Sequence, residues 1–125
     1  MVRLCMNDGK RLVVTFFQQD NGNEPVRDWI TSLPDDDKRT VGFELQKVEF
    51  GWPIGMPLCR QIKGHKRLWE VRIRLTGGRI ARVFFCTQDQ EMILLHGFEK
   101  KSQKTPQKEI ETAKKRLRRL RDEIK

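Results

Sequence analysis

The chain of 125 residues carries a net charge of +9, and its length suits one domain but not two independently cored ones. No apolar run approaches the roughly 18 residues that a membrane span needs, and the start shows no secretion signal, so we expect a single cytoplasmic domain over residues 1–125 with no membrane partner. Three cysteines without a C-x-x-C pair and only two histidines argue against a disulfide framework or a zinc site, and we expect no metal and no cofactor.

The first half of the chain predicts one strand followed by two helices. Residues 11–17 are β-branched and aromatic, which is typical of a strand. After a polar loop, Asn23 is the expected N-cap of a short helix over residues 24–31. A second helix is expected from Asp35 to about Trp52, with apolar residues at helical spacing, and a Gly- and Pro-rich loop ends it.

The second half predicts an antiparallel meander and a final helix. Residues 68–75 alternate between apolar and charged side chains, and after a Thr-Gly-Gly turn the alternation resumes over 79–87 and 91–98. We expect helices on one face of this sheet and arginines on the other. Thr105 as N-cap and Pro106 in the first turn predict a helix over 105–125, whose apolar stripe could dock on the sheet or on a partner.

Positive charge is concentrated in two segments. Residues 60–82 have a net charge of +7 and residues 98–125 of +6, whereas the rest of the chain is mildly acidic. This segregation favours a polyanionic partner, most often a nucleic acid. The alternative is a solvated face with a basic tail.

One group of candidate residues lies on the predicted hairpin: Glu70, Arg72, Arg74 and Arg82. Residues two apart on a strand share a face, and the partner strand is only about 5 Å away. Arginine binds phosphate oxygens through two parallel hydrogen bonds. This face could therefore hold a scissile phosphate and stabilise the transition state of its cleavage. Simple alternation on a solvent-facing strand would give the same pattern.

A second group follows the last strand: His96, Lys100, Lys101 and Lys104. Histidine titrates near neutral pH and suits proton transfer, although a lone histidine at a strand end is also commonly structural. The lysines could contact phosphates. Further candidates for RNA or ribosome binding are Lys63, His65, Lys66, Arg67, Lys104 and Lys108.

Other chemistries lack their motifs. The sequence contains no P-loop, no G-x-G-x-x-G, no G-x-S-x-G and no H-E-x-x-H. The acids at 35–37 are interpreted as charge at a helix N-terminus, so a nuclease that uses divalent metal is disfavoured.

Three stretches give the chain a family resemblance. They are residues 58–63 with LWEVRIRL, the strand RIARVFF after a Gly-Gly hairpin, and the ending HGFEKKSQKTPQKEIETAKKR. From about residue 11 onward the chain resembles the RelE/HigB superfamily of bacterial toxins, in its phage-derived HigB-like branch. Residues 1–10 lie outside the resemblance, and whether they are ordered stays open.

The resemblance implies a fold and an activity. The fold is α+β and RelE-like, with an antiparallel or mixed sheet of four to five strands, two N-terminal helices on one face and a C-terminal basic helix. The activity is that of a metal-independent mRNA endonuclease in the ribosomal A site, which yields a 2′,3′-cyclic phosphate. Arg72, Arg74 and Arg82 match the family's phosphate-binding positions, and Lys100, Lys101 and Lys104 match its basic cluster.

The general acid and base stay open in this resemblance. Some relatives use a carboxylate with histidine or tyrosine; this chain has no tyrosine, so His96 with Glu70 and the lysines are both candidates. The implied partners are the 70S ribosome, mRNA and a helix-turn-helix, HigA-like antitoxin. Two alternatives are a non-catalytic nucleic-acid-binding phage accessory protein and an inactive toxin homologue.

Overall fold

The computed structural model of the chain describes residues 9–100 and 106–124. Lys101, Lys104 and Thr105, singled out above, lie outside the described residues, as do residues 1–8. In chain order the elements are β1 (Val13–Phe16), α2 (Pro25–Thr31), α3 (Asp35–Gly51), β2 (Cys59–Gln61), β3 (Trp69–Arg74), η1 (Thr76–Gly78), β4 (Ile80–Gln88), β5 (Glu91–Lys100) and α4 (Gln107–Ile124).

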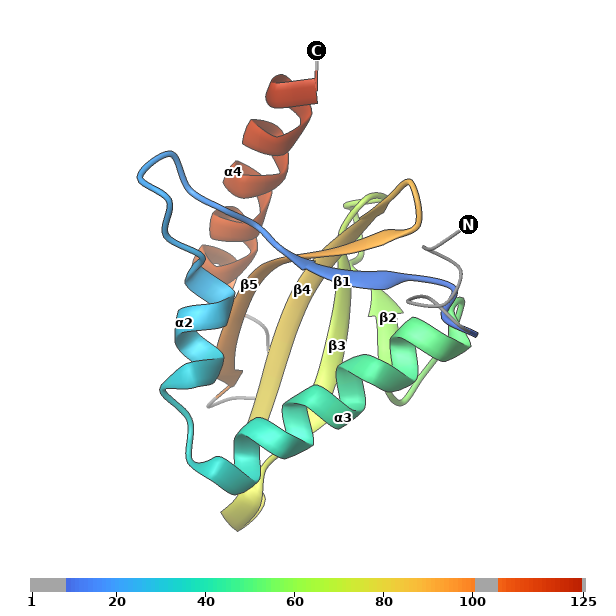
Figure 1. Cartoon of the computed structure of the whole chain (residues 1–125), viewed down its shortest axis with the longest axis vertical. Coiled ribbons are helices and arrows are strands. Elements are labelled where there is room, and N and C mark those ends of the chain that lie inside the picture. The colour runs from blue at the N-terminus through green and yellow to red at the C-terminus, as the bar shows by residue number, and fades with distance from the viewer. Residues whose placement is uncertain (1–8, 101–105, 125) are drawn as a thin grey trace.

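The described strands form one mixed sheet in the order β1-β5-β4-β3-β2 (Figure 1). The strands β2 to β5 pair as an antiparallel meander, and β1 pairs in parallel with β5. The expected α+β class and the mixed sheet are confirmed. The three residues of β2 are too few to show an alternating pattern, so the sequence does not predict this strand.

The helices α2 and α3 cover one face of the sheet (Figure 1). Val26 of α2 and Val41, Leu45 and Val48 of α3 are buried against inward-facing residues of β3, β4 and β5. The N-cap of α2 is Glu24 rather than the predicted Asn23. The start is set by Pro25, since proline lacks the N–H that the first turn of a helix leaves unbonded and its φ already suits the helix.

The opposite face of the sheet is shared between α4 and the arginines. The buried residue Ala113 and the partly buried Ile110, Leu117 and Leu120 of α4 pack on apolar residues of β4 and β5. Of the two uses left open for the apolar stripe of α4, the structure shows docking on the sheet. The expected packing of the two N-terminal helices on the face opposite the arginines is confirmed for α2 and α3. The C-terminal helix α4 lies on the arginine face instead, where Phe84, Leu95 and Phe98 make one half of that face apolar.

No helix among the described residues is long and apolar enough to cross a membrane.

Candidate anion-binding site

Four neighbouring strands bring basic side chains together on the part of the sheet that α4 leaves uncovered. Arg72 of β3 pairs directly with Arg82 of β4, and Arg60 of β2 pairs with Glu70 of β3. Ile80 of β4 pairs with Arg74 on one side and with Lys100 of β5 on the other. Directly paired residues point to the same face, so five basic residues and one acid share one surface. We call Arg60, Glu70, Arg72, Arg74, Arg82 and Lys100 the basic cluster.

Glu70 is the buried centre of this cluster. Its side chain is fully buried, and its Oε1 accepts hydrogen bonds from Arg60 Nε at 2.7 Å and from Arg82 Nη1 at 2.8 Å. A buried carboxylate between two guanidinium groups fixes their positions. Glu70 therefore acts here as a positioning residue for Arg60 and Arg82.

The cluster holds more positive charge than Glu70 can balance. The Nε atoms of Arg72 and Arg82 are buried and have no hydrogen-bond partner in the described part of the chain. Burial lowers the pKa of Arg82 below its ordinary value, and the neighbouring Arg72 and Arg60 act in the same direction. Positive charges packed this closely repel one another, and an anion bound by the guanidinium groups on this surface would offset that repulsion.

Lys100 lies at the end of β5, within the field of these arginines. Burial lowers the pKa of Lys100 below 10.5, and the positive charges of Arg82, Arg60 and Arg72 lower it further, while Glu70 opposes them. A lysine in this setting loses its proton more readily than one in water, which suits acid–base chemistry.

His96 is on the same face but its ring is occupied elsewhere. His96 Nε2 lies 2.7 Å from Glu109 Oε1, and Nδ1 lies 3.3 Å from Nη1 of Arg116; both partners belong to α4. The ring also stacks on Phe98, with centroids 5.5 Å apart. Burial lowers the pKa of His96 below 6.5. The structure therefore places His96 at the α4 interface rather than in the basic cluster.

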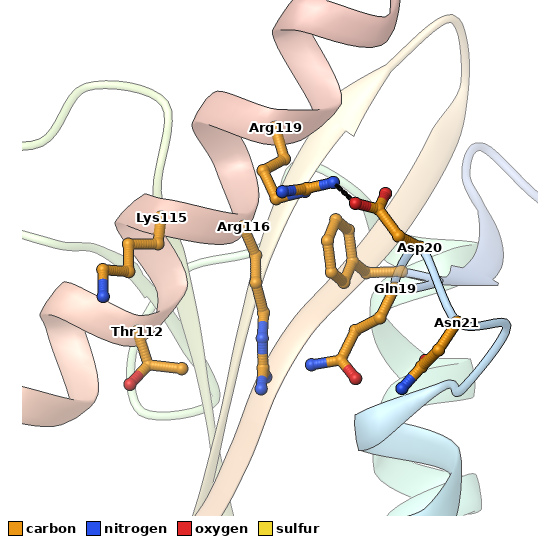
Figure 2. Close-up of a pocket in the computed structure, with 8 residues that line it drawn as sticks. Gln19, Asp20, Asn21, Thr112, Lys115, Arg116 and Arg119 are labelled. Atoms are coloured by element: carbon orange, nitrogen blue, oxygen red, sulfur yellow. Dashed lines mark hydrogen bonds and ion pairs between the residues drawn. The ribbon is translucent and has the colours of Figure 1, made fainter.

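Arg116 and Arg119 also hold α4 in place. Arg116 Nη1 donates to the carbonyl oxygen of Leu95 at 2.8 Å, and Arg119 pairs with Asp20 in the loop before α2. Arg116, Arg119 and Asp20 line a cavity of about 500 Å³ between α4 and the chain after β1 (Figure 2). The charges of Arg116 and Arg119 thus serve the docking of α4.

On its other side α4 forms a second basic surface with the loop between β2 and β3. His65, Lys66 and Arg67, which the sequence predicts to bind RNA, line a groove of about 280 Å³ together with Lys114, Arg118 and Arg121. No ion pair is found for Lys66, Arg67, Arg118 or Arg121 within the described residues. Lys63 is exposed in the same loop, and Lys108 is exposed in the first turn of α4.

Sequence reasoning missed the contribution of α4 to this groove. Lys114, Arg118 and Arg121 recur at i, i+4 and i+7, which places them on one side of a helix. That spacing could have identified a basic stripe. Nothing in the sequence, however, pairs the stripe with residues 65–67, some fifty positions earlier.

Two other charged residues have structural roles. Asp37, interpreted as one of three acids at a helix N-terminus, is fully buried; it accepts a hydrogen bond from the Thr76 backbone N–H at 3.1 Å and pairs with Arg79. The bond from Thr76 is the main reason that the pKa of Asp37 lies below its usual value. Arg79 also donates to Glu99 at 2.9 Å, so Arg79 serves the hairpin rather than the basic cluster.

Comparison with known proteins places the chain in a family. Residues 28–118 match the family described as phage derived protein Gp49-like (DUF891). This range begins within α2, ends within α4 and contains every residue of the basic cluster. No curated protein matches the chain. Among the described residues, no group of three or more His, Cys, Asp or Glu side chains could hold a metal ion. Since the match covers well over half of the sequence, the chain belongs to the Gp49-like phage-derived protein family, which is related to the RelE/HigB-type toxins.

Proposed function

We propose that this protein is the toxin of a type II toxin–antitoxin pair and acts as a ribosome-dependent mRNA endoribonuclease. The observation that carries the proposal is the pair Arg72 and Arg82, which lie directly opposite each other on a sheet face that holds five basic residues and one acid. Membership of a family related to RelE/HigB-type toxins supports it.

In the proposed reaction the 2′-oxygen of one nucleotide attacks the adjacent phosphorus, and the bond to the 5′-oxygen breaks. The products are a 2′,3′-cyclic phosphate and a 5′-hydroxyl. Arg72 and Arg82 bind the non-bridging oxygens and offset the negative charge that builds up in the transition state. Glu70 holds both Arg60 and Arg82 in position.

Proton transfer falls to Lys100 in this proposal. Its lowered pKa supports removal of the 2′-hydroxyl proton by the neutral amine, and a second group must protonate the leaving 5′-oxygen. We assign no acid–base role to His96, because both of its ring nitrogens face groups of α4. Glu70 is excluded from proton transfer in this scheme by its burial between Arg60 and Arg82.

The ribosome completes the proposed site by positioning the mRNA. Orientation of reacting groups alone can contribute several kcal/mol to the lowering of a barrier. The groove between residues 65–67 and α4 offers a basic surface for ribosomal RNA. The further proposed partner is a helix-turn-helix antitoxin, and the proposed place of action is the cytoplasm, where the ribosomes are.

The decisive experiment is primer extension on a defined mRNA with the purified protein, with and without translating ribosomes. We expect cuts within A-site codons that require ribosomes and are lost in Arg72→Gln. An absence of cuts in both lanes, together with salt-sensitive RNA binding, would instead favour a non-catalytic nucleic-acid-binding protein or an inactive toxin homologue.

A further inference from the structure

A cavity of about 490 Å³ lies beside the basic cluster, at the edge of the sheet. Its walls are residues 54–58, Glu44 and Lys47 of α3, and Arg72 and Arg74 of β3. Arg72 thus belongs both to the basic cluster and to this cavity. A ligand bound to Arg72 on the face of the sheet would therefore lie next to this cavity, which extends past the β3 edge of the sheet to α3.

The cavity exists because β2 is short. β2 pairs only with the first three residues of β3, and the carbonyl of Leu58 accepts the N–H of Arg72 at 2.8 Å. No described strand runs beside Arg74 on that side, and because peptide groups two residues apart point the same way, the N–H of Arg74 faces the open edge. One open residue is too little for a peptide to add as a strand, since strands usually have three or more.

The walls differ in chemistry from the basic cluster. Met56 is 62% exposed, and with Ile54, Pro57 and Leu58 it forms an apolar wall. Arg72 and Arg74 line the same cavity and add guanidinium groups to it. A flat aromatic ring suits such a lining, because thioethers contact aromatic rings favourably and guanidinium groups stack on bases.

Glu44 is the one acid among the described residues that line this cavity, which also include the basic Lys47, Arg72 and Arg74. Its Oε1 accepts from Lys47 Nζ at 3.2 Å, while Oε2 has no partner in the part of the chain that the structure describes. A carboxylate accepts hydrogen bonds from the N–H groups of a base, which the basic side chains of the lining cannot do. Guanine presents two neighbouring donors on one edge and therefore matches Glu44 better than uracil, which presents one.

We propose that this cavity binds the base of a nucleotide whose phosphate lies at Arg72 and Arg82, and that Glu44 favours guanine there. The proposal rests on the proposed endoribonuclease function and deepens it by assigning the residues that select the cleaved sequence. Met56 supplies an apolar surface for the ring of the base, and the Glu44 carboxylate accepts hydrogen bonds from the N–H groups on its edge.

The first test measures binding without cleavage. Guanosine 3′-monophosphate and uridine 3′-monophosphate are titrated into the intact protein and followed by amide NMR shifts. We expect shifts at residues 54–58 and Arg74 with both nucleotides and tighter binding of the guanosine compound by about tenfold, the discrimination of a good two-donor contact. Glu44→Gln should remove most of this preference, and Met56→Ala should weaken both nucleotides. Shifts confined to other regions, or equal affinities in the wild type, would overturn the proposal.

The second test maps cleavage on ribosomes. Glu44→Gln should redistribute cuts among codons while total cleavage persists. Asp36→Asn, the same kind of acid-to-amide change at an exposed position of α3 outside the cavity walls, should leave the map unchanged. An unchanged map in Glu44→Gln would reject the cavity but not the nuclease. A wild type that never cuts but binds guanosine 3′-monophosphate at residues 54–58 would reject the nuclease but not the cavity.

Discussion

Arg72 and Arg82 lie directly opposite each other on β3 and β4, and the Nε of each is buried without a hydrogen-bond partner among the described residues. Like charges directly opposite on neighbouring strands destabilise a sheet. The fold tolerates the pair because Glu70, two residues before Arg72 on β3, accepts a hydrogen bond of 2.8 Å from Arg82. The remaining positive charge is what an RNA phosphate would neutralise.

Arg72→Gln should slow cleavage strongly without unfolding the protein. Arg72 is only partly buried and makes no ion pair in the described residues, so its loss removes a phosphate contact and some repulsion. We expect a fall in single-turnover cleavage of about 10²–10³-fold, as for the loss of one donor to a transition-state oxygen. The melting temperature should stay the same or rise. Near-normal cleavage by a folded Arg72→Gln protein would contradict the proposed role.

Glu70→Gln should destabilise the fold. It leaves Arg82 buried with no full negative charge beside it, and removing one partner of a buried ion pair costs about 3–5 kcal/mol. Because Arg60 is 46% exposed, water compensates part of its loss, and we expect the lower end of this range in urea unfolding. In the double variant Glu70→Gln/Arg82→Met much of the stability should return; equal instability of both variants would mean that the charge pair is not the cause.

The pH dependence of cleavage should report Lys100. A general base acts in its neutral form, so the rate should rise with pH and level off at the pKa of Lys100, which burial and Arg82 place below the usual 10.5. Lys100→Arg keeps the charge but cannot lose its proton at these pH values, so the rise should disappear. Single-turnover rates on ribosomal complexes between about pH 6 and 9 would test this. If the rate of Lys100→Arg still rose with pH in the same way, Lys100 would be excluded as the base.

Acid should weaken the docking of α4 through His96. Burial holds the pKa of His96 in the folded state below 6.5, so the unfolded chain binds the proton more readily. The neutral form's contribution to stability is present above pH 6.5 and is lost as the pH falls toward and through the folded-state pKa. We expect a fall in melting temperature between pH 7.5 and 5 that is smaller in His96→Gln. An identical fall in both proteins would place the acid sensitivity elsewhere.

Reversing charge in the groove should weaken ribosome binding and leave the chemistry intact. Arg118→Glu/Arg121→Glu changes two residues that line the groove with residues 65–67 and make no ion pair in the described part of the chain. The affinity for ribosomes should fall, and the slope of its salt dependence should drop by about one per lost phosphate contact. Arg27→Glu/Arg39→Glu, on the exposed sides of α2 and α3, changes the net charge equally and serves as the control. Equal losses in the two double variants would indicate a general charge effect.

Local sequence patterns predicted most of the helices and strands, because these elements depend on side-chain period and turn residues within a short stretch of chain. The alternation over 68–75 and 79–87 follows from the two-residue period of a strand, and the turn between them requires positive φ at Gly77 and Gly78, which glycine adopts without strain. The period also placed Arg72 and Arg82 on one face. By contrast β2 and the N-cap of α2 escaped prediction, because three residues show no period and because a proline one position later decides where α2 begins.

The amino-acid sequence alone determined the fold class, the basic face and the candidate arginines, since these depend on side-chain period and charge. Only the tertiary structure decided what each charge does. It brought Glu109 and Arg116 to His96, Asp37 to Arg79, and Arg60 with Arg82 to one oxygen of Glu70. These contacts join residues 10 to 42 positions apart, whose pairing is set by sheet register and helix docking rather than by any local pattern.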